Sequence, residues 1–182
     1  IFKYINPLVF HLSFLLPKIK IISYVEFMMF ETKYLPSYKS WFEPDGFLCI
    51  QPFFSKENAF KKIKEVIDLC QKFGVVPFWC PIKKYKKENI NPLDFNVDNE
   101  GYSIVIDFFP KEYDENKINN FISELESMIK KQGGKFYLSK DQIMSKKFFQ
   151  ETYPNFQKFL DLKKKYDPNN KFISNQYLRL FH

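Results

Sequence analysis

Histidine and glycine are scarce in this chain of 182 residues. The two histidines, His11 and His182, stand far apart in the sequence, so we expect neither a histidine-based catalytic triad nor a histidine metal site. Only five glycines are present, and Gly133-Gly134 is their one adjacent pair. No glycine-rich loop is therefore available to hold the phosphates of a dinucleotide. We expect protein outside this chain to bind such phosphates, and the chain to be part of a longer protein.

Cysteine is scarce as well. Cys49, Cys70 and Cys80 are too few and too scattered for a disulfide framework or a zinc site. Each lies within an apolar run, which predicts three buried free thiols. Such thiols fit a reducing compartment, so we predict a cytoplasmic location.

A long apolar run is also missing. The segment Tyr4 to Pro17 is apolar but interrupted by polar residues, and it is shorter than the roughly 20 residues of a membrane-spanning helix. We interpret it as buried or interfacial. Peripheral association with a membrane remains compatible with this reading.

Positive charge is in excess, with a net charge of +7. This balance permits an anionic partner such as a phosphate, a nucleic acid or an acidic membrane surface. Tight lysine clusters lie at residues 83–84, 86–87 and 163–165. The glycine and aromatic pattern of an RNA-recognition strand is absent, so our preferred reading includes no nucleic acid. A non-catalytic basic module that binds nucleic acid or anionic lipid is the alternative hypothesis.

Apolar periodicity predicts four strands and two helices between them. The strands are predicted over residues 47–54, 75–82, 101–109 and 135–138. The first helix is expected to be capped by Ser55 and to end at Gly74, and the second to be capped by Asp114. The order strand, helix, strand, strand, helix, strand is typical of the ferredoxin-like split βαβ arrangement. We therefore predict an α+β fold, with an antiparallel sheet and both helices on one face.

Finer expectations concern individual segments. Pro52 indicates the exit of its strand or an exposed edge. The nearly continuous apolar run 75–82 indicates a central strand, and the polar residues 83–99 a long loop. Helices are predicted from Ser145 to Tyr153 and from Asn155 to Tyr166, followed by an extended tail over 172–181.

The stretch Gly133 to Asp141 combines a helix stop, a short strand and a charged pair. The two glycines suit a helix end, and Phe136 and Leu138 alternate with more polar residues. Binding groups often follow a strand end, because a rigid sheet orients the loop there. Lys140 is therefore our first candidate for a functional residue, although a surface lysine before a turn is an equally simple interpretation.

Four stretches in order resemble the C-terminal half of flavin oxidoreductases of the vanillyl-alcohol-oxidase superfamily. The branch they are most similar to is that of the decaprenylphosphoryl-ribose oxidases. The stretches are Gly46 to Gln51, Phe78 to Lys83, Gly101 to Phe108 and Gly133 to Asp141. The tail fits in order and spacing through Tyr153-Pro154, Asp167-Pro168, Ser174 and Arg179-Leu180.

This resemblance implies FAD as cofactor and a division into three parts. Residues 1–45 would pack on an N-terminal FAD-binding domain, residues 46–141 would form a cap that holds the substrate, and residues 142–182 would be a helical tail returning to the FAD domain. The substrate would be a sugar or a lipid-linked sugar, oxidised at a secondary alcohol by hydride transfer to flavin N5.

The resemblance also implies roles for individual residues. Tyr137 and Lys140 would lie at the flavin, with Lys140 as the catalytic residue, while Lys83, Ser103 and, less directly, Gln51 would face the substrate. A fixed cation near the flavin N1 and C2 carbonyl stabilises the reduced anion. A second lysine, Lys83, could hold an anionic group of the substrate as a point charge.

The chain departs from this branch at three positions. Cys49 stands where the branch has glutamine, and Ser103 and Val105 replace an asparagine and a cysteine. These three differences change the chemistry of the pocket, so we expect them to affect which substrate the protein binds.

Overall fold

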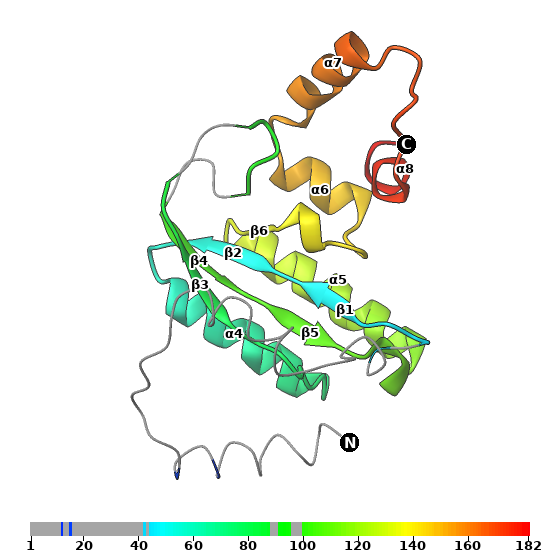
Figure 1. Cartoon of the computed structure of the whole chain (residues 1–182). Coiled ribbons are helices and arrows are strands. Elements are labelled where there is room, and N and C mark those ends of the chain that lie inside the picture. Colours follow the sequence, from blue (N-terminus) through cyan, green and yellow to red (C-terminus); the bar gives the residue numbers. More distant parts are fainter. Residues whose placement is uncertain (1–11, 13–14, 16–41, 43, 88–90, 96–99) are drawn as a thin grey trace. The chain divides into compact units, whose positions relative to one another are not determined.

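The computed structural model describes residues 12, 15, 42, 44–87, 91–95 and 100–182 (Figure 1). Residues Leu48–His182 form one compact unit, and Ile1–Phe47 form another. The predicted packing of residues 1–45 on another domain falls almost entirely outside the described residues. The account that follows concerns Leu48–His182.

A four-stranded antiparallel sheet lies at the centre of this unit. Its order is β3 (Ile82–Tyr85), β4 (Gly101–Ile104), β2 (Pro52–Ser55) and β6 (Lys135–Phe136). Strands β1 (Leu48–Ile50) and β5 (Ile106–Phe108) form an adjoining antiparallel pair. They continue the chain paths of β2 and β4, with one residue between the strands in each case. The order and antiparallel pairing confirm the ferredoxin-like α+β prediction.

Two helices, α4 (Ala59–Lys72) and α5 (Glu115–Lys131), pack against one face of the sheet (Figure 1). The helices and the sheet share one core, which includes Phe54, Ile104, Ile106, Phe121 and Leu125. Strand side chains alternate between faces, so the intervening strand residues project away from the helices. That second face carries the candidate site.

The cap of α5 is the one that the sequence predicts. The Asp114 side chain accepts hydrogen bonds from the backbone N–H groups of Asn116 at 3.0 Å and Lys117 at 3.2 Å. The predicted helix stop is confirmed too, because Gly133 has a φ of 69°.

Replacing Asp114 by alanine should lower the free energy of unfolding by about 1 kcal/mol, because two backbone donors lose their acceptor. Urea denaturation measures this change. An Asp114→Asn variant, which keeps a capping oxygen, should recover most of the loss; an alanine variant as stable as the native chain would contradict the assignment.

The start of α4 differs from the prediction. Ser55 is the last residue of β2 and pairs with Gly101, so it cannot cap a helix. The helix begins after Asn58, which adopts a left-handed conformation with a φ of 54°. Asparagine tolerates this conformation better than most residues. Phe60, expected on the buried stripe, is 63% exposed.

The predictions for Pro52 and for residues 75–82 were wrong. Pro52 opens β2, a central strand, where a first-position proline costs no ladder hydrogen bond. The run 75–82 leads into the edge strand β3, and its residue Trp79 is 51% exposed. Pro77 and Pro81 cannot donate to a ladder, so regular pairing begins only at Ile82. Cys80 is exposed and not buried.

The C-terminal part is helical, as predicted, but more completely so. A turn of 3-10 helix, η3 (Leu138–Lys140), follows β6, and the helices α6 (Lys146–Thr152), α7 (Phe156–Tyr166) and α8 (Asn175–Phe181) come after it. The expected extended tail over 172–181 was wrong, because Ser174 caps α8 by accepting from Tyr177 N at 3.0 Å. A second 3-10 turn of the same length, η2 (Pro110–Glu112), precedes α5.

None of the helices in the described ranges is long and apolar enough to cross a membrane.

Candidate functional site

One row of side chains crosses the sheet on the face away from α4 and α5. Lys83 of β3 is paired with Ser103 of β4, Ser103 with Phe53 of β2, and Phe53 with Lys135 of β6. Directly paired residues in an antiparallel sheet project from the same face. The sheet register therefore places the predicted residues Lys83 and Ser103 side by side, with Lys83 exposed and Ser103 fully buried.

Gln51 forms the centre of a buried hydrogen-bond group at this row. Its Nε2 donates to the Ser103 hydroxyl at 2.9 Å and to the Tyr85 hydroxyl at 2.7 Å. The Gln51 side chain is 1% exposed, and its Oε1 has no hydrogen-bond partner among the described residues. A buried acceptor without a donor is costly, and a bound hydroxyl group would satisfy it.

Tyr137 lies next to this group. Its backbone N–H donates to the Gln51 carbonyl at 2.9 Å. Its ring packs on Phe95, with 4.7 Å between the ring centroids, and Phe95 also contacts Tyr85 and Phe53. An aromatic layer therefore covers this end of the sheet face.

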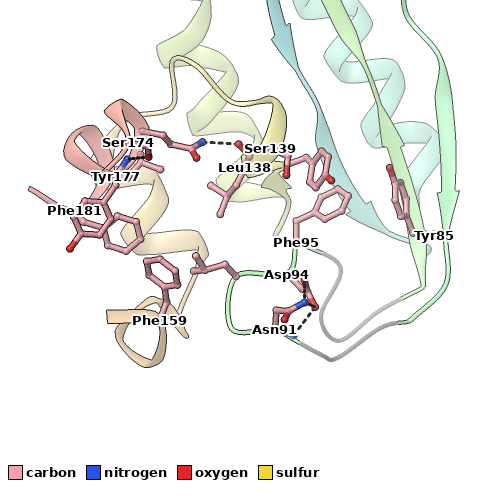
Figure 2. A pocket seen from close by; sticks show the side chains of 14 residues that line it. Tyr85, Asn91, Asp94, Phe95, Leu138, Ser139, Phe159, Ser174, Tyr177 and Phe181 are labelled. Atoms are coloured by element: carbon pink, nitrogen blue, oxygen red, sulfur yellow. Dashed lines mark hydrogen bonds between the residues drawn. The ribbon is translucent and has the colours of Figure 1, made fainter. Parts of the chain in front are cut away.

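A cavity of about 570 Å³ opens beyond this layer (Figure 2). Residues 91–95 form one side, and α7 and α8 form the other (Figure 2). Aromatic rings dominate the lining, which consists of Tyr85, Asn91, Leu93, Asp94, Phe95, Tyr137, Leu138, Ser139, Phe159, Ser174, Gln176, Tyr177, Leu180 and Phe181. Cavities of this kind suit a ligand with flat apolar faces and a few polar groups.

Lys140 does not line this cavity, but it lies at the other end of the same sheet face. Its backbone N–H donates to the Tyr137 carbonyl at 3.1 Å within η3. Its side-chain ammonium lies near the Cys49 thiol and interacts with it through its charge and a hydrogen bond. Cys49 precedes Gln51 by two residues and is paired with Asp107 of β5. Burial and the Asp107 carboxylate raise the pKa of the Cys49 thiol to about 12, while the Lys140 ammonium lowers it. The thiol therefore stays neutral between a cation and an anion.

The two predicted lysines lie at different positions along the strands. Ser103, which neighbours Lys83, and Asp107, which neighbours Cys49, are four residues apart on one chain path. At about 3.3 Å per residue this is roughly 13 Å. The two predicted lysines thus stand toward opposite ends of the face, and the Gln51 group lies between them.

Sequence reasoning missed several contributors. Tyr85 could have been found, because it follows Lys83 by two residues and so shares its face. Asp107 could have been found in the same way from Ser103, through the alternation along 101–108. Nothing in the local sequence indicates that Phe95, from a polar connection, or Gln176, from the tail, would reach the cavity.

Ion pairs neutralise part of the positive charge on the described surface. Five lysines, Lys56, Lys64, Lys72, Lys84 and Lys130, are paired with carboxylates there.

Comparison with known proteins identifies a family and a similar curated protein. Residues 51–180 match the family described as D-arabinono-1,4-lactone oxidase. The chain is also 27% identical over 135 residues to decaprenylphosphoryl-beta-D-ribose oxidase of Mycolicibacterium smegmatis. That alignment covers 74% of this chain and 28% of the relative, so the chain spans under a third of the relative's length. The chain belongs to the D-arabinono-1,4-lactone oxidase family, whose members are FAD-linked oxidases.

Proposed function

We propose that this chain is the substrate-binding and C-terminal part of an FAD-dependent oxidoreductase that oxidises a secondary alcohol of a sugar or lipid-linked sugar. The observation that carries the proposal is the buried Gln51 group, which lies between Lys140 and Lys83 on the sheet face away from α4 and α5. The names of the matched family and relative, both oxidases of sugar-type compounds, support the same reaction class.

The residues present fit one half of FAD. Lys140, held near Cys49 on the sheet face, is a donor suited to the anionic edge of a reduced isoalloxazine ring, and Tyr137 is close by in the chain. With five glycines, the chain offers no phosphate-binding loop. We infer that the ring meets this face while another part of the protein binds the pyrophosphate. When bound, FAD supplies the two-electron acceptor.

The remaining site residues suit a sugar. A hydroxyl is both a donor and an acceptor, so one sugar hydroxyl could donate a hydrogen bond to Gln51 Oε1 and accept one from a neighbouring group. The rings of Tyr137 and Phe95 offer apolar faces for the C–H side of a sugar. Lys83, exposed and next to Ser103, is placed to hold an anionic group such as a phosphate.

Gln51→Leu tests substrate binding at this group. Leucine keeps the bulk but removes the acceptor, together with the two hydrogen bonds that Nε2 donates to Ser103 and Tyr85. We expect kcat/KM for sugar oxidation to fall by about 10- to 100-fold, because leaving a buried polar group without its partner costs about 1–3 kcal/mol. Flavin reduction with a panel of aldonolactones, pentoses and their phosphorylated forms is the measurement.

A matched control tests whether the effect depends on where the lost amide lies. Gln157→Leu removes an exposed amide that contacts Asp161 on α7, and it should leave kcat/KM unchanged. If Gln51→Leu also leaves kcat/KM unchanged for every oxidised sugar, Gln51 does not belong to the substrate site.

A further inference from the structure

We propose that the C-terminal helix α8 positions Lys140, with Arg179 and Gln176 as the positioning residues. This inference rests on the proposed function, because it concerns the lysine assigned there to the flavin. Neither residue is near Lys140 in the sequence. Gln176 contacts the chain on both sides of the lysine, and Arg179 contacts the segment directly after it.

The first contact involves the Asp141 carboxylate, which holds the backbone directly after Lys140 in a turn. Asp141 Oδ1 accepts from the backbone N–H groups of Ile143 at 3.1 Å and Met144 at 2.7 Å. Its Oδ2 accepts from Arg179 Nη2 at 2.7 Å, and Arg179 Nη1 donates to the Met144 carbonyl. The Asp141 side chain is only 3% exposed, so its charge depends on these donors.

The second contact fixes the backbone around Lys140 itself. Gln176 Nε2 donates to the Leu138 carbonyl at 2.6 Å and to the Asp141 carbonyl at 3.2 Å. These two carbonyls stand before and after Lys140. Helix α8 therefore holds both ends of the η3 turn, across 35 to 38 residues of sequence.

The helix is itself anchored to the core. A helix of seven residues is not stable alone, so its position depends on packing. Leu180 is 1% exposed, and the Phe181 ring lies 4.9 Å from that of Phe149 on α6. Helix α8 therefore attaches the η3 turn to a fixed part of the structure. The Lys140 ammonium needs such support if it is to keep a defined position.

A lysine side chain has four rotatable bonds. The position of its ammonium group can therefore be defined only if the backbone that carries it is held in place. Loss of Arg179 would leave the buried Asp141 carboxylate with two backbone donors and the Gln176 amide at 3.4 Å, without the guanidinium charge beside it, and would loosen the segment after Lys140. The charge would then act on the ring from a spread of positions, with a weaker average effect.

The test uses full-length protein with bound FAD and the variants Arg179→Met and Gln176→Leu. Two readouts are taken: hydrogen exchange of the Ile143 and Met144 amides, and the midpoint potential of the FAD. Lys146→Met is the matched control, because Lys146 Nζ donates to the His182 carbonyl at the end of the same helix without reaching the turn. It should change neither readout.

We expect the hydrogen-exchange rates of the Ile143 and Met144 amides to rise at least tenfold in Arg179→Met. The midpoint potential of the FAD should fall in the same variant. In a Lys140→Met background the same substitution should leave the potential unchanged, because the charge it positions is gone. Gln176→Leu keeps every charge and should show a smaller change of the same kind, so it serves if Arg179→Met does not fold.

Two results overturn the inference, and they are distinguishable. If the potential falls equally with and without Lys140, or stays constant while exchange rises, α8 has a structural role only. If Lys140→Met alone leaves the potential unchanged, the proposed function fails and the positioning role fails with it.

Discussion

Replacing Lys140 by methionine should slow substrate-dependent reduction of the flavin by about 100- to 1,000-fold, the effect of removing one pre-organised charge at the reacting group. Methionine keeps the length of the side chain but not its positive charge. The loss corresponds to about 3 kcal/mol, or roughly 60 mV in the midpoint potential of a two-electron couple. Anaerobic stopped-flow absorbance of the flavin measures the rate, and redox titration measures the potential.

Two comparisons make this prediction specific. Lys140→Arg retains the charge and should keep part of the rate. Lys83→Met, at the other end of the sheet face, should raise KM for an anionic substrate and leave the potential unchanged. Equal potentials in the native protein and in Lys140→Met would remove Lys140 from the flavin.

Replacing Gly101 by alanine should destabilise the fold by more than about 3 kcal/mol, in the range of backbone clashes and severe overpacking. A Cβ at this position would lie 2.1 Å from the Phe54 carbonyl oxygen and 2.6 Å from the Phe53 ring. Backbone atoms cannot move aside without disturbing the pairing of β2 with β4. Because that pairing sets Ser103 beside Phe53, the substrate site would be lost as well.

Gly133→Ala is the matched control for Gly101→Ala. No atom lies within 4 Å of a Cβ built at Gly133, although its φ is +69°, so only conformational strain of about 1–2 kcal/mol is expected. Thermal unfolding of both variants measures the two losses of stability. A Gly101→Ala variant that loses no more stability than Gly133→Ala would show that the close approach of β2 and β4 is relaxed in solution.

The strand and helix order could be predicted from sequence because it depends on local signals. The Asp114 cap, the Gly133 stop and the alternation along 101–109 each act within a few residues, and the structure has all three. The α+β class and the four-stranded antiparallel arrangement follow from that order.

What sequence could not supply depends on contacts between distant segments. The apolar run 75–82 has the composition of a central strand, but only the pairing of β2 with β4 shows that β3 lies at the edge. The helix over residues 175–181 begins at the Ser174 cap, which is a local signal, but a helix of seven residues also depends on packing against α6, which the local sequence does not report. Likewise Lys140 was identifiable as a candidate, whereas the contacts of Arg179 and Gln176 with the chain around it join segments 35 to 38 residues apart.

Hydrogen exchange of the full-length protein with and without FAD is the most direct test of where the flavin lies. We predict that FAD protects β1 and the segment 137–144, around Cys49 and Lys140, and leaves the outer faces of α4 and α5 unchanged. Protection confined to those two helices would mean that the flavin does not meet the sheet face that carries Gln51, Ser103 and Lys83.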